Sequence, residues 1–214
     1  MVNEYQLINI SKMIKGHSIL SDINLKLEGG KIYGLIGENG SGKTMLLRLM
    51  SGLINPTSGC IKIDGKICNI AKKRNINIGV IIENVCLYQD MTALDNLIYL
   101  ASINKIATQQ DIYNILKAVG LDPNDKRKVR KYSLGMRQKL SIAQCFMENP
   151  DLILLDEPTN GLDAESTKKV LNLIKSSSER GAIILLVSHI KDDIFNICDT
   201  IYSMEKGIIT EVIK

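Results

Sequence analysis

The segment at residues 37–44 reads G-E-N-G-S-G-K-T and fits the pattern G-x-x-x-x-G-K-[ST] at every constrained position. Glycines tolerate backbone angles that strain other residues, so such a loop can wrap an anion with its own N–H groups. An apolar run at residues 31–36 enters it as a predicted strand, and another at residues 45–50 leaves it as a predicted helix, whose N-terminus would face the anion. We call this predicted phosphate-holding segment the phosphate loop: Gly37, Glu38, Asn39, Gly40, Ser41, Gly42, Lys43 and Thr44.

Two side chains at the end of the phosphate loop bring charge and metal-binding chemistry. We expect Lys43 to reach the β- and γ-phosphates of a nucleotide and the Thr44 hydroxyl to ligate Mg²⁺. The plainer alternative is a glycine-rich turn that matches the pattern by chance. The strand before the loop and the helix after it argue against that alternative.

Composition limits the class of protein. A chain of 214 residues, 45% apolar and 23% charged, suffices for one domain, or one domain with a subdomain, around an ample core. The N-terminus lacks the pattern of a signal peptide, and no window reaches about 18 uninterrupted apolar residues, so we expect no transmembrane helix. Five cysteines without C-x-x-C spacing predict reduced thiols in a cytosolic protein. The net charge of +4 does not by itself indicate nucleic acid.

The apolar periodicity changes twice along the chain. Residues 5–10, 18–27, 60–66 and 76–82 predict strands, with Ile19, Ile23, Leu25 and Leu27 on one face of the second. Residues 91–147 have helical periodicity and no convincing strand. Strands at 152–155, 182–187, 200–204 and 208–212 follow, with a helix at 164–178 and a short helix near Lys191. The pattern predicts an α/β fold: a mixed sheet, antiparallel strands at the N-terminal end, and an inserted helical subdomain.

Two carboxylates end the apolar strand at residues 152–155. Asp156 at the carboxyl end of a parallel strand can reach the water shell of Mg²⁺ beside the phosphate loop. Glu157 can face the attacking water as a general base. A solvent-exposed acidic turn is the plainer alternative. His189 follows the strand at 182–187 and, by its place at the same sheet edge, can contact the γ-phosphate and orient the water.

The segment Y-S-L-G-M-R-Q at residues 132–138, the signature segment below, opens a strongly helical run. Ser133 fits an N-cap, and the Gly135 N–H would lie in the first turn, ready for another anion. A capped helix alone is a weak signal. Its position about twenty residues before the acidic pair Asp156–Glu157 strengthens it.

In this order, the motifs resemble those of the nucleotide-binding subunits of ATP-binding cassette (ABC) transporters. The resemblance covers the whole chain, with the signature segment in place of the usual LSGGQ, Asp163 in the D-loop and His189 as the switch histidine. It implies one domain over residues 1–214, with a core of about 1–85 and 150–214 and a helical subdomain of about 86–149.

The resemblance also implies a mode of action. The implied cofactors are ATP and Mg²⁺. The chain is expected to form a head-to-tail dimer, either with a second copy of itself or with a paralogue. Each ATP lies between the phosphate loop of one subunit and Ser133 and Gly135 of the other. An integral membrane permease is the expected partner, at the cytoplasmic face of the cell membrane, and no nucleic acid is expected.

The sequence departs from the family pattern in three respects. Glu83 stands where the family usually has the Q-loop glutamine, which is similar to the bacitracin-resistance and lantibiotic-immunity group; a carboxylate there can still ligate Mg²⁺. Ile14 stands where an aromatic residue usually stacks on adenine. Leu134 and Met136 alter the signature segment but leave Ser133 and Gly135 in place.

Two function classes compete. The first is an ATPase subunit of a membrane transporter, with export of an antimicrobial peptide or similar substrate as the subgroup interpretation. The second is a soluble, non-transport ABC ATPase acting on a macromolecular complex. A kinase or GTPase fits less well, because the signature segment and His189 have no place in it and no N-K-x-D element occurs in the sequence.

Overall fold

A six-stranded sheet forms the centre of the computed structural model, which describes residues 2–68, 76–83, 87–188 and 196–212. Its strand order is β10-β9-β3-β8-β7-β6. The five strands from β9 to β6 run parallel, and β10 pairs antiparallel with β9 at one edge. The strand bounds are β3 (Ile32–Ile36), β6 (Ile78–Ile81), β7 (Leu152–Asp156), β8 (Ile183–Val187), β9 (Thr200–Glu205) and β10 (Ile208–Val212).

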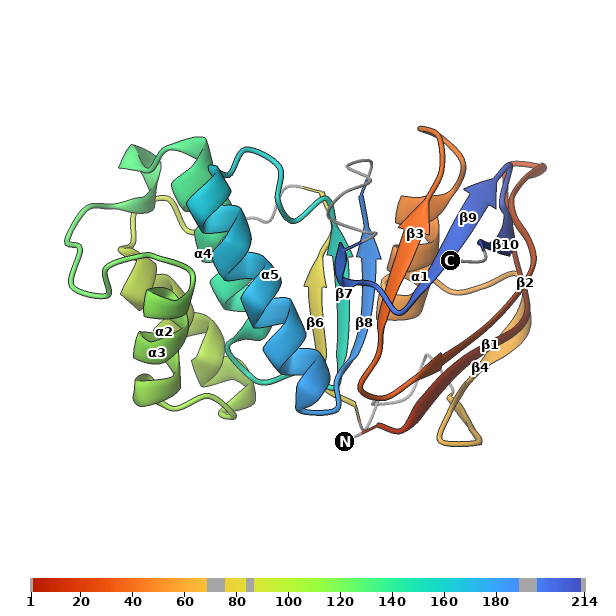
Figure 1. The fold of residues 1–214 in the computed structure, drawn as a ribbon, viewed down its shortest axis with the longest axis horizontal. Helices are drawn as coiled ribbons and strands as arrows, with labels where there is room; N and C mark the ends of the chain where they lie inside the picture. Colours follow the sequence, from red (N-terminus) through yellow and green to blue (C-terminus); the bar gives the residue numbers. More distant parts are fainter. Residues whose placement is uncertain (1, 69–75, 84–86, 189–195, 213–214) are drawn as a thin grey trace.

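Both faces of this sheet are covered, which explains the continuous apolar runs of β7 and β8. On one face, Leu152 and Leu154 pack with α1 (Lys43–Ser51) and with the second sheet. On the other face, Ile153 and Leu155 pack with α5 (Ala164–Glu179) and the neighbouring helices. Figure 1 shows α5 and α1 on opposite sides of β7 and β8.

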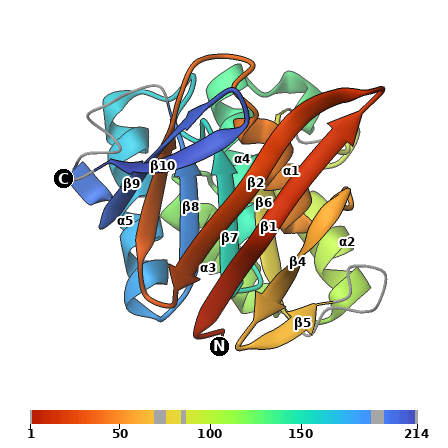
Figure 2. The ribbon, with the colours of Figure 1, turned by 90° about the vertical axis from the view of Figure 1, so that its right-hand side faces the viewer.

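The second sheet is antiparallel, in the order β2-β1-β4-β5, and lies across the outside of α1 (Figure 2). Its strands are β1 (Glu4–Ile14), β2 (His17–Glu28), β4 (Ser58–Ile63) and β5 (Lys66–Cys68).

A bulge in β2 corrects one sequence expectation. Ile10 pairs with Ile23 but Lys12 pairs with Leu20, so β2 has one extra residue there, and Asp22 adopts a φ of 48°. The bulge shifts the alternation by one residue, and Leu20 is fully buried in place of Ile19.

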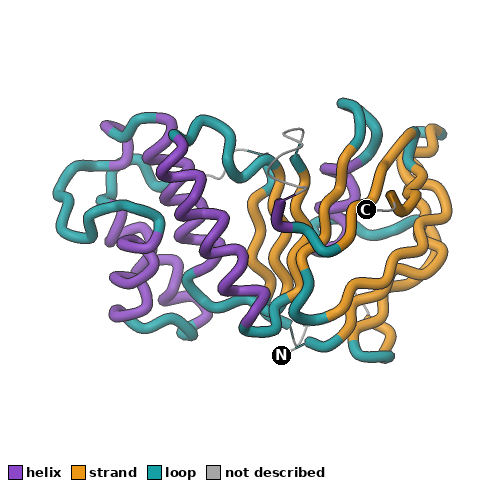
Figure 3. The backbone as a smooth tube through the Cα atoms, viewed as in Figure 1, coloured by secondary structure: helices purple, strands orange, loops and turns teal. Residues whose placement is uncertain are grey.

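Between β6 and β7, the described residues form four helical elements, which gather at the end of the molecule away from the second sheet (Figure 3). They are α2 (Ala93–Asn104), α3 (Gln109–Ala118), the 3₁₀ turn η1 (Val129–Lys131) and α4 (Leu134–Phe146). The prediction of helices without strands over residues 91–147 is confirmed. The α/β fold with antiparallel N-terminal strands and inserted helices is confirmed as well.

The burial pattern of α2 differs from the predicted stripe. Ile98 is 39% exposed, whereas Asn96 is fully buried. The Asn96 side chain accepts a hydrogen bond from Tyr88 N and donates to Tyr88 O and Thr92 O. A buried amide with these partners fixes the segment that leads from the sheet into α2.

The short helix expected near Lys191 lies outside the described residues. Over the ranges that the structure describes, no helix is both long and apolar enough to cross a bilayer.

Candidate functional site

Three neighbouring parallel strands bring the predicted site residues to one edge of the sheet. β8 lies between β3 and β7, with Val187 in register with Leu35 on one side and Asp156 on the other. The Glu157 N–H donates a 2.9 Å hydrogen bond to the Val187 carbonyl just beyond the strands. The phosphate loop after β3 and the acidic pair after β7 therefore share the carboxyl edge, where ligands bind in such sheets. His189 comes two residues after Val187 in the sequence and lies outside the described residues.

The phosphate loop has a backbone that only glycine accommodates at its key positions. Gly37 and Gly42 have φ values of 152° and 112°. A Cβ on Gly37 would lie 2.3 Å from the Met204 carbonyl oxygen, and one on Gly42 would lie 3.1 Å from that of Ile19. Gly40 has a φ of 81°. A side chain at Gly37 would collide with backbone, and one at Gly42 would be crowded and strained by the positive φ, so the loop conformation depends on these glycines.

The phosphate loop brings several polar groups together. Lys43 Nζ donates to the carbonyl oxygens of Gly37 (2.7 Å) and Glu38 (2.8 Å). Ser41 is 7% exposed, and its buried Oγ has no hydrogen-bond partner within the described residues. Glu38 and Asn39 are exposed at the tip. An ammonium group, an unsatisfied hydroxyl and a helix N-terminus fit a phosphate group.

Thr44 and Asp156 supply adjoining oxygens for a cation. The Thr44 hydroxyl donates a 2.9 Å hydrogen bond to Asp156 Oδ2. Burial raises the pKa of Asp156 and the negative charge of Glu157 adds to the rise, while the hydrogen bond from Thr44 and the charge of Lys43 oppose it. Within the described ranges, no group of three or more His, Cys, Asp and Glu side chains is placed to hold a metal. Mg²⁺ at phosphate sites is usually held by one or two protein oxygens together with the phosphates, so this pair fits it.

Glu157 adopts a φ of 50°, a left-handed conformation that costs a non-glycine residue of order 1–3 kcal/mol. The next residues hold it there: Asn160 N donates to the Glu157 carbonyl, and Gln138 Nε2 donates to the Pro158 carbonyl. Gln138 belongs to the signature segment, so α4 supports the backbone of the acidic pair. The sequence interpretation missed this role of Gln138, because nothing in the spacing shows that α4 passes residue 158.

The signature segment starts α4 as predicted. Ser133 is the N-cap, and its side chain accepts a 3.2 Å hydrogen bond from Met136 N. A Cβ on Gly135 would lie 3.0 Å from the Gly161 carbonyl oxygen, so the segment packs on the loop after the acidic pair. Asp163 caps α5, and the hydrogen bond from the Ser166 N–H lowers its pKa.

Ser133 and Asp163 are exposed. In the part of the chain that the structure describes, no hydrogen bond joins Ser133, Gly135 or Asp163 to residues 37–44. The structure thus forms two separate groups of predicted site residues.

Two further candidates stand apart from the Thr44–Asp156 pair. Ile14 ends β1, is 37% exposed and pairs with His17 across the hairpin. Glu83 follows β6, and its Oε1 accepts a 2.7 Å charged hydrogen bond from Arg48 Nη2. Arg48 was missed in the sequence, although its position four residues after Thr44 places it on the same face of α1.

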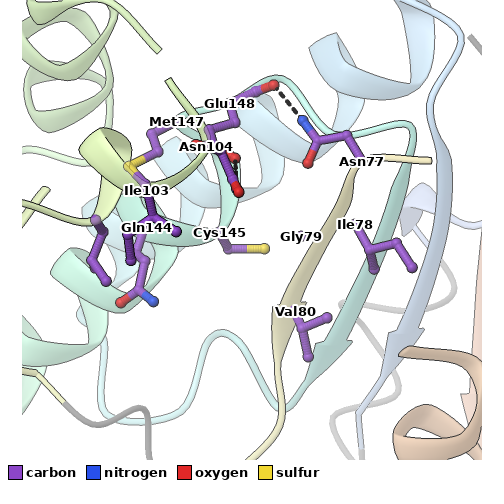
Figure 4. A pocket seen from close by; sticks show the side chains of 11 residues that line it. Asn77, Ile78, Gly79, Val80, Ile103, Asn104, Gln144, Cys145, Met147 and Glu148 are labelled. Carbon is purple, nitrogen blue, oxygen red and sulfur yellow. Dashed lines mark hydrogen bonds between the residues drawn. The ribbon is translucent and has the colours of Figure 1, made fainter. Parts of the chain in front are cut away.

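A cavity of about 270 Å³ lies between β6 and the helices α2 and α4 (Figure 4). Asn77 Nδ2 donates to the Glu148 carbonyl oxygen, and Asn104 Nδ2 donates to Glu148 Oε2. None of the predicted site residues lines this cavity.

Comparison with known proteins shows the family of this chain. The family model described as ABC transporter matches residues 20–160. The uncharacterized ABC transporter ATP-binding protein YybJ of Bacillus subtilis (strain 168) is 44% identical over 202 residues, which cover 94% of this chain and 93% of that protein. The bacitracin transport ATP-binding protein BcrA of Bacillus licheniformis is 39% identical over 207 residues, which cover 96% of this chain and 68% of that protein.

A solved structure has the same fold. The dimeric post-hydrolysis state of the ATP-binding cassette MJ0796, bound to ADP and phosphate, superposes with a TM-score of 0.86 at 27% identity, over 97% of each chain. The family model covers more than half of the chain, and the chain belongs to the ABC transporter family as one of its ATP-binding domains.

Proposed function

We propose that this chain binds and hydrolyses ATP to power a membrane ABC exporter of an antimicrobial peptide or a similar substrate. One observation supports the ATPase part above all others. The phosphate loop and the acidic pair lie at one sheet edge, joined by the hydrogen bond from Thr44 to Asp156.

Each residue at that edge has a chemical role in the proposal. Lys43 binds the β- and γ-phosphates, and the loop N–H groups and Ser41 complete the cradle. Thr44 and Asp156 hold Mg²⁺, which neutralises phosphate charge when bound. Glu157 accepts a proton from the attacking water as general base, and His189 orients that water.

The second group of residues requires a second subunit. Ser133, Gly135 and Asp163 are proposed to complete the site of a partner copy, either of this chain or of a paralogue, in a head-to-tail dimer. Support comes from the solved cassettes of this fold that are dimers. The helical subdomain, about residues 86–149, would then turn against the core of about 1–85 and 150–214 as ATP closes the dimer.

The transport partner and substrate come from the relatives. BcrA is a bacitracin transport ATP-binding protein, and SrtF of Streptococcus pyogenes, 36% identical over 93% of this chain and 86% of that protein, is a lantibiotic transport ATP-binding protein. We infer an integral membrane permease as partner, a place at the cytoplasmic face of the membrane, and a peptide antibiotic as exported substrate. Glu83 in place of the usual glutamine agrees with this subgroup.

A pull-down tests the transporter part. A tagged Glu157→Gln chain, held with ATP, is captured from detergent-solubilised membranes of the native cell, and its partners are identified by mass spectrometry. A polytopic membrane protein in about equal amount is the expected result. Recovery of ribosomal or other soluble complexes alone would overturn the proposal in favour of a non-transport ATPase.

A cell assay tests the substrate. Deletion of the protein is expected to raise sensitivity to bacitracin-like or lantibiotic peptides, and the parental chain, but not the Glu157→Gln chain, is expected to restore resistance. Unchanged sensitivity to these peptides after deletion would contradict the export of antimicrobial peptides.

A further inference from the structure

The ion pair between Arg48 and Glu83 joins the last turn of α1 to the end of β6. Arg48 Nη2 lies 2.7 Å from Glu83 Oε1, and the two side chains are 36% and 60% exposed. A guanidinium–carboxylate hydrogen bond is directional and charge-assisted, so it fixes where the carboxylate lies. At this exposure the pair is also weak enough to exchange for another partner.

The same helix carries the proposed Mg²⁺ ligand. Thr44 and Arg48 are four residues apart in α1 and therefore lie on one face, separated by a rise of about 6 Å along the axis. The Thr44 hydroxyl contacts Asp156, whereas the Arg48 guanidinium contacts Glu83. The Glu83 carboxylate is thus held by a residue one helical turn from Thr44. Its charge is one of those that act on Asp156, in agreement with this proximity.

We propose that Arg48 is a positioning residue that holds the Glu83 carboxylate away from the Mg²⁺ site until nucleotide and metal bind. This inference rests on the proposed ATPase function. It adds a competition between Arg48 and the metal for the Glu83 carboxylate. Arg48 lies one helical turn along α1 from Thr44, so a Glu83 carboxylate that moves to the metal moves away from Arg48, and metal binding with Glu83 competes with the ion pair. Binding of nucleotide and metal at the start of α1 is thereby linked to loss of the contact between Arg48 and Glu83 at the end of β6. A glutamine at position 83 would lack the charge that creates this competition.

A double-mutant cycle on the full chain tests the competition. Binding of Mn²⁺, as a spectroscopic probe for Mg²⁺, is measured by electron paramagnetic resonance with a non-hydrolysable ATP analogue. The four proteins are the parent, Arg48→Gln, Glu83→Gln and the double variant. We expect Arg48→Gln to lower the half-saturating Mn²⁺ concentration about two- to fivefold, the size for an exposed ion pair. In the Glu83→Gln background, the same change should have no effect.

The contrary outcomes are distinct. An equal shift in both backgrounds would mean that Arg48 acts on the cation by charge alone, and no shift or weaker Mn²⁺ binding would equally overturn the inference. Failure of the parent to bind Mn²⁺ with the analogue would instead contradict the proposed ATPase site. Lys26→Gln removes an ion-paired cation on the second sheet (Lys26 Nζ to Glu4 Oε2, 2.7 Å) and should leave Mn²⁺ binding unchanged. If Arg48→Gln does not fold, Arg48→Met, which keeps a long apolar stem but removes the charged partner of Glu83, replaces it in the cycle with the same criteria.

Discussion

The Thr44 hydroxyl donates a hydrogen bond of 2.9 Å to the Asp156 carboxylate across 112 positions of the sequence. This contact joins the first turn of α1 to the end of β7 and sets the two proposed Mg²⁺ ligands side by side. The Asp156 carboxylate is partly buried there, and this burial raises its pKa.

Asp156→Asn should weaken metal binding while it stabilises the folded state at neutral pH. The pKa of Asp156 is raised above its ordinary value of 3.8, so its ionisation disfavours the folded state as the pH rises through that pKa. Without ligand, the variant should melt at a higher temperature than the parent at pH 7, and the gain should shrink as the pH falls towards 3.8. Addition of Mg²⁺ to the ATP-bound protein should raise the melting temperature of the parent further but not that of the variant. A less stable variant at pH 7 without ligand would contradict this explanation.

Lys43→Ala should weaken ATP binding. A charged hydrogen bond to phosphate contributes about 1.5–3 kcal/mol, so the Kd for a fluorescent ATP analogue should rise at least about tenfold. Lys31→Ala is the matched control, because Lys31 precedes β3 at its other end and pairs with Glu28 at 2.6 Å. Similar losses in both variants would show that general charge, not the phosphate loop, governs the affinity.

Ile14→Tyr should strengthen nucleotide binding. An aromatic ring that stacks on adenine is worth about 0.5–1.5 kcal/mol, which corresponds to a KM for ATP lower by about two- to tenfold. Met13, 44% exposed and adjacent in β1, points to the opposite face of the strand, so Met13→Tyr should leave the KM unchanged. Equal Michaelis constants for Ile14→Tyr and the parent would show that adenine does not stack at position 14.

Ser133→Arg should abolish ATP hydrolysis while ATP still binds at the phosphate loop. Ser133 is the exposed N-cap of α4, so the variant loses a cap and gains bulk at the proposed subunit contact. Thr108→Arg removes the capping box of α3 and is the control for the lost cap, which costs about 0.5–2 kcal/mol. Both variants should lose similar thermal stability, but only Ser133→Arg should lose hydrolysis. Full hydrolytic activity of Ser133→Arg would show that the signature segment does not take part in ATP hydrolysis.

The sequence predicted most strands and the two motif groups because local patterns determine them. β7 is a continuous apolar run that ends in Asp156, and glycine spacing defines the phosphate loop. The bulge at Asp22 was not predictable, because its positive φ occurs at a residue other than glycine and depends on pairing with β1. The pairing of Arg48 with Glu83 was also missed, since it joins a helix to a strand end 35 residues later. Contacts of this kind depend on how the elements pack.

Glu157→Gln provides the most direct measurement, as it removes the proposed base while the phosphate loop stays intact. Mass by light scattering and the rate of ATP hydrolysis are measured on the purified variant with ATP and Mg²⁺. The expected result is retained ATP, hydrolysis lower by at least about 100-fold, and a particle of twice the mass of one chain. Hydrolysis at the parental rate, or a particle of single-chain mass with ATP bound, would contradict the proposed ATP-bound dimer with Glu157 as its base.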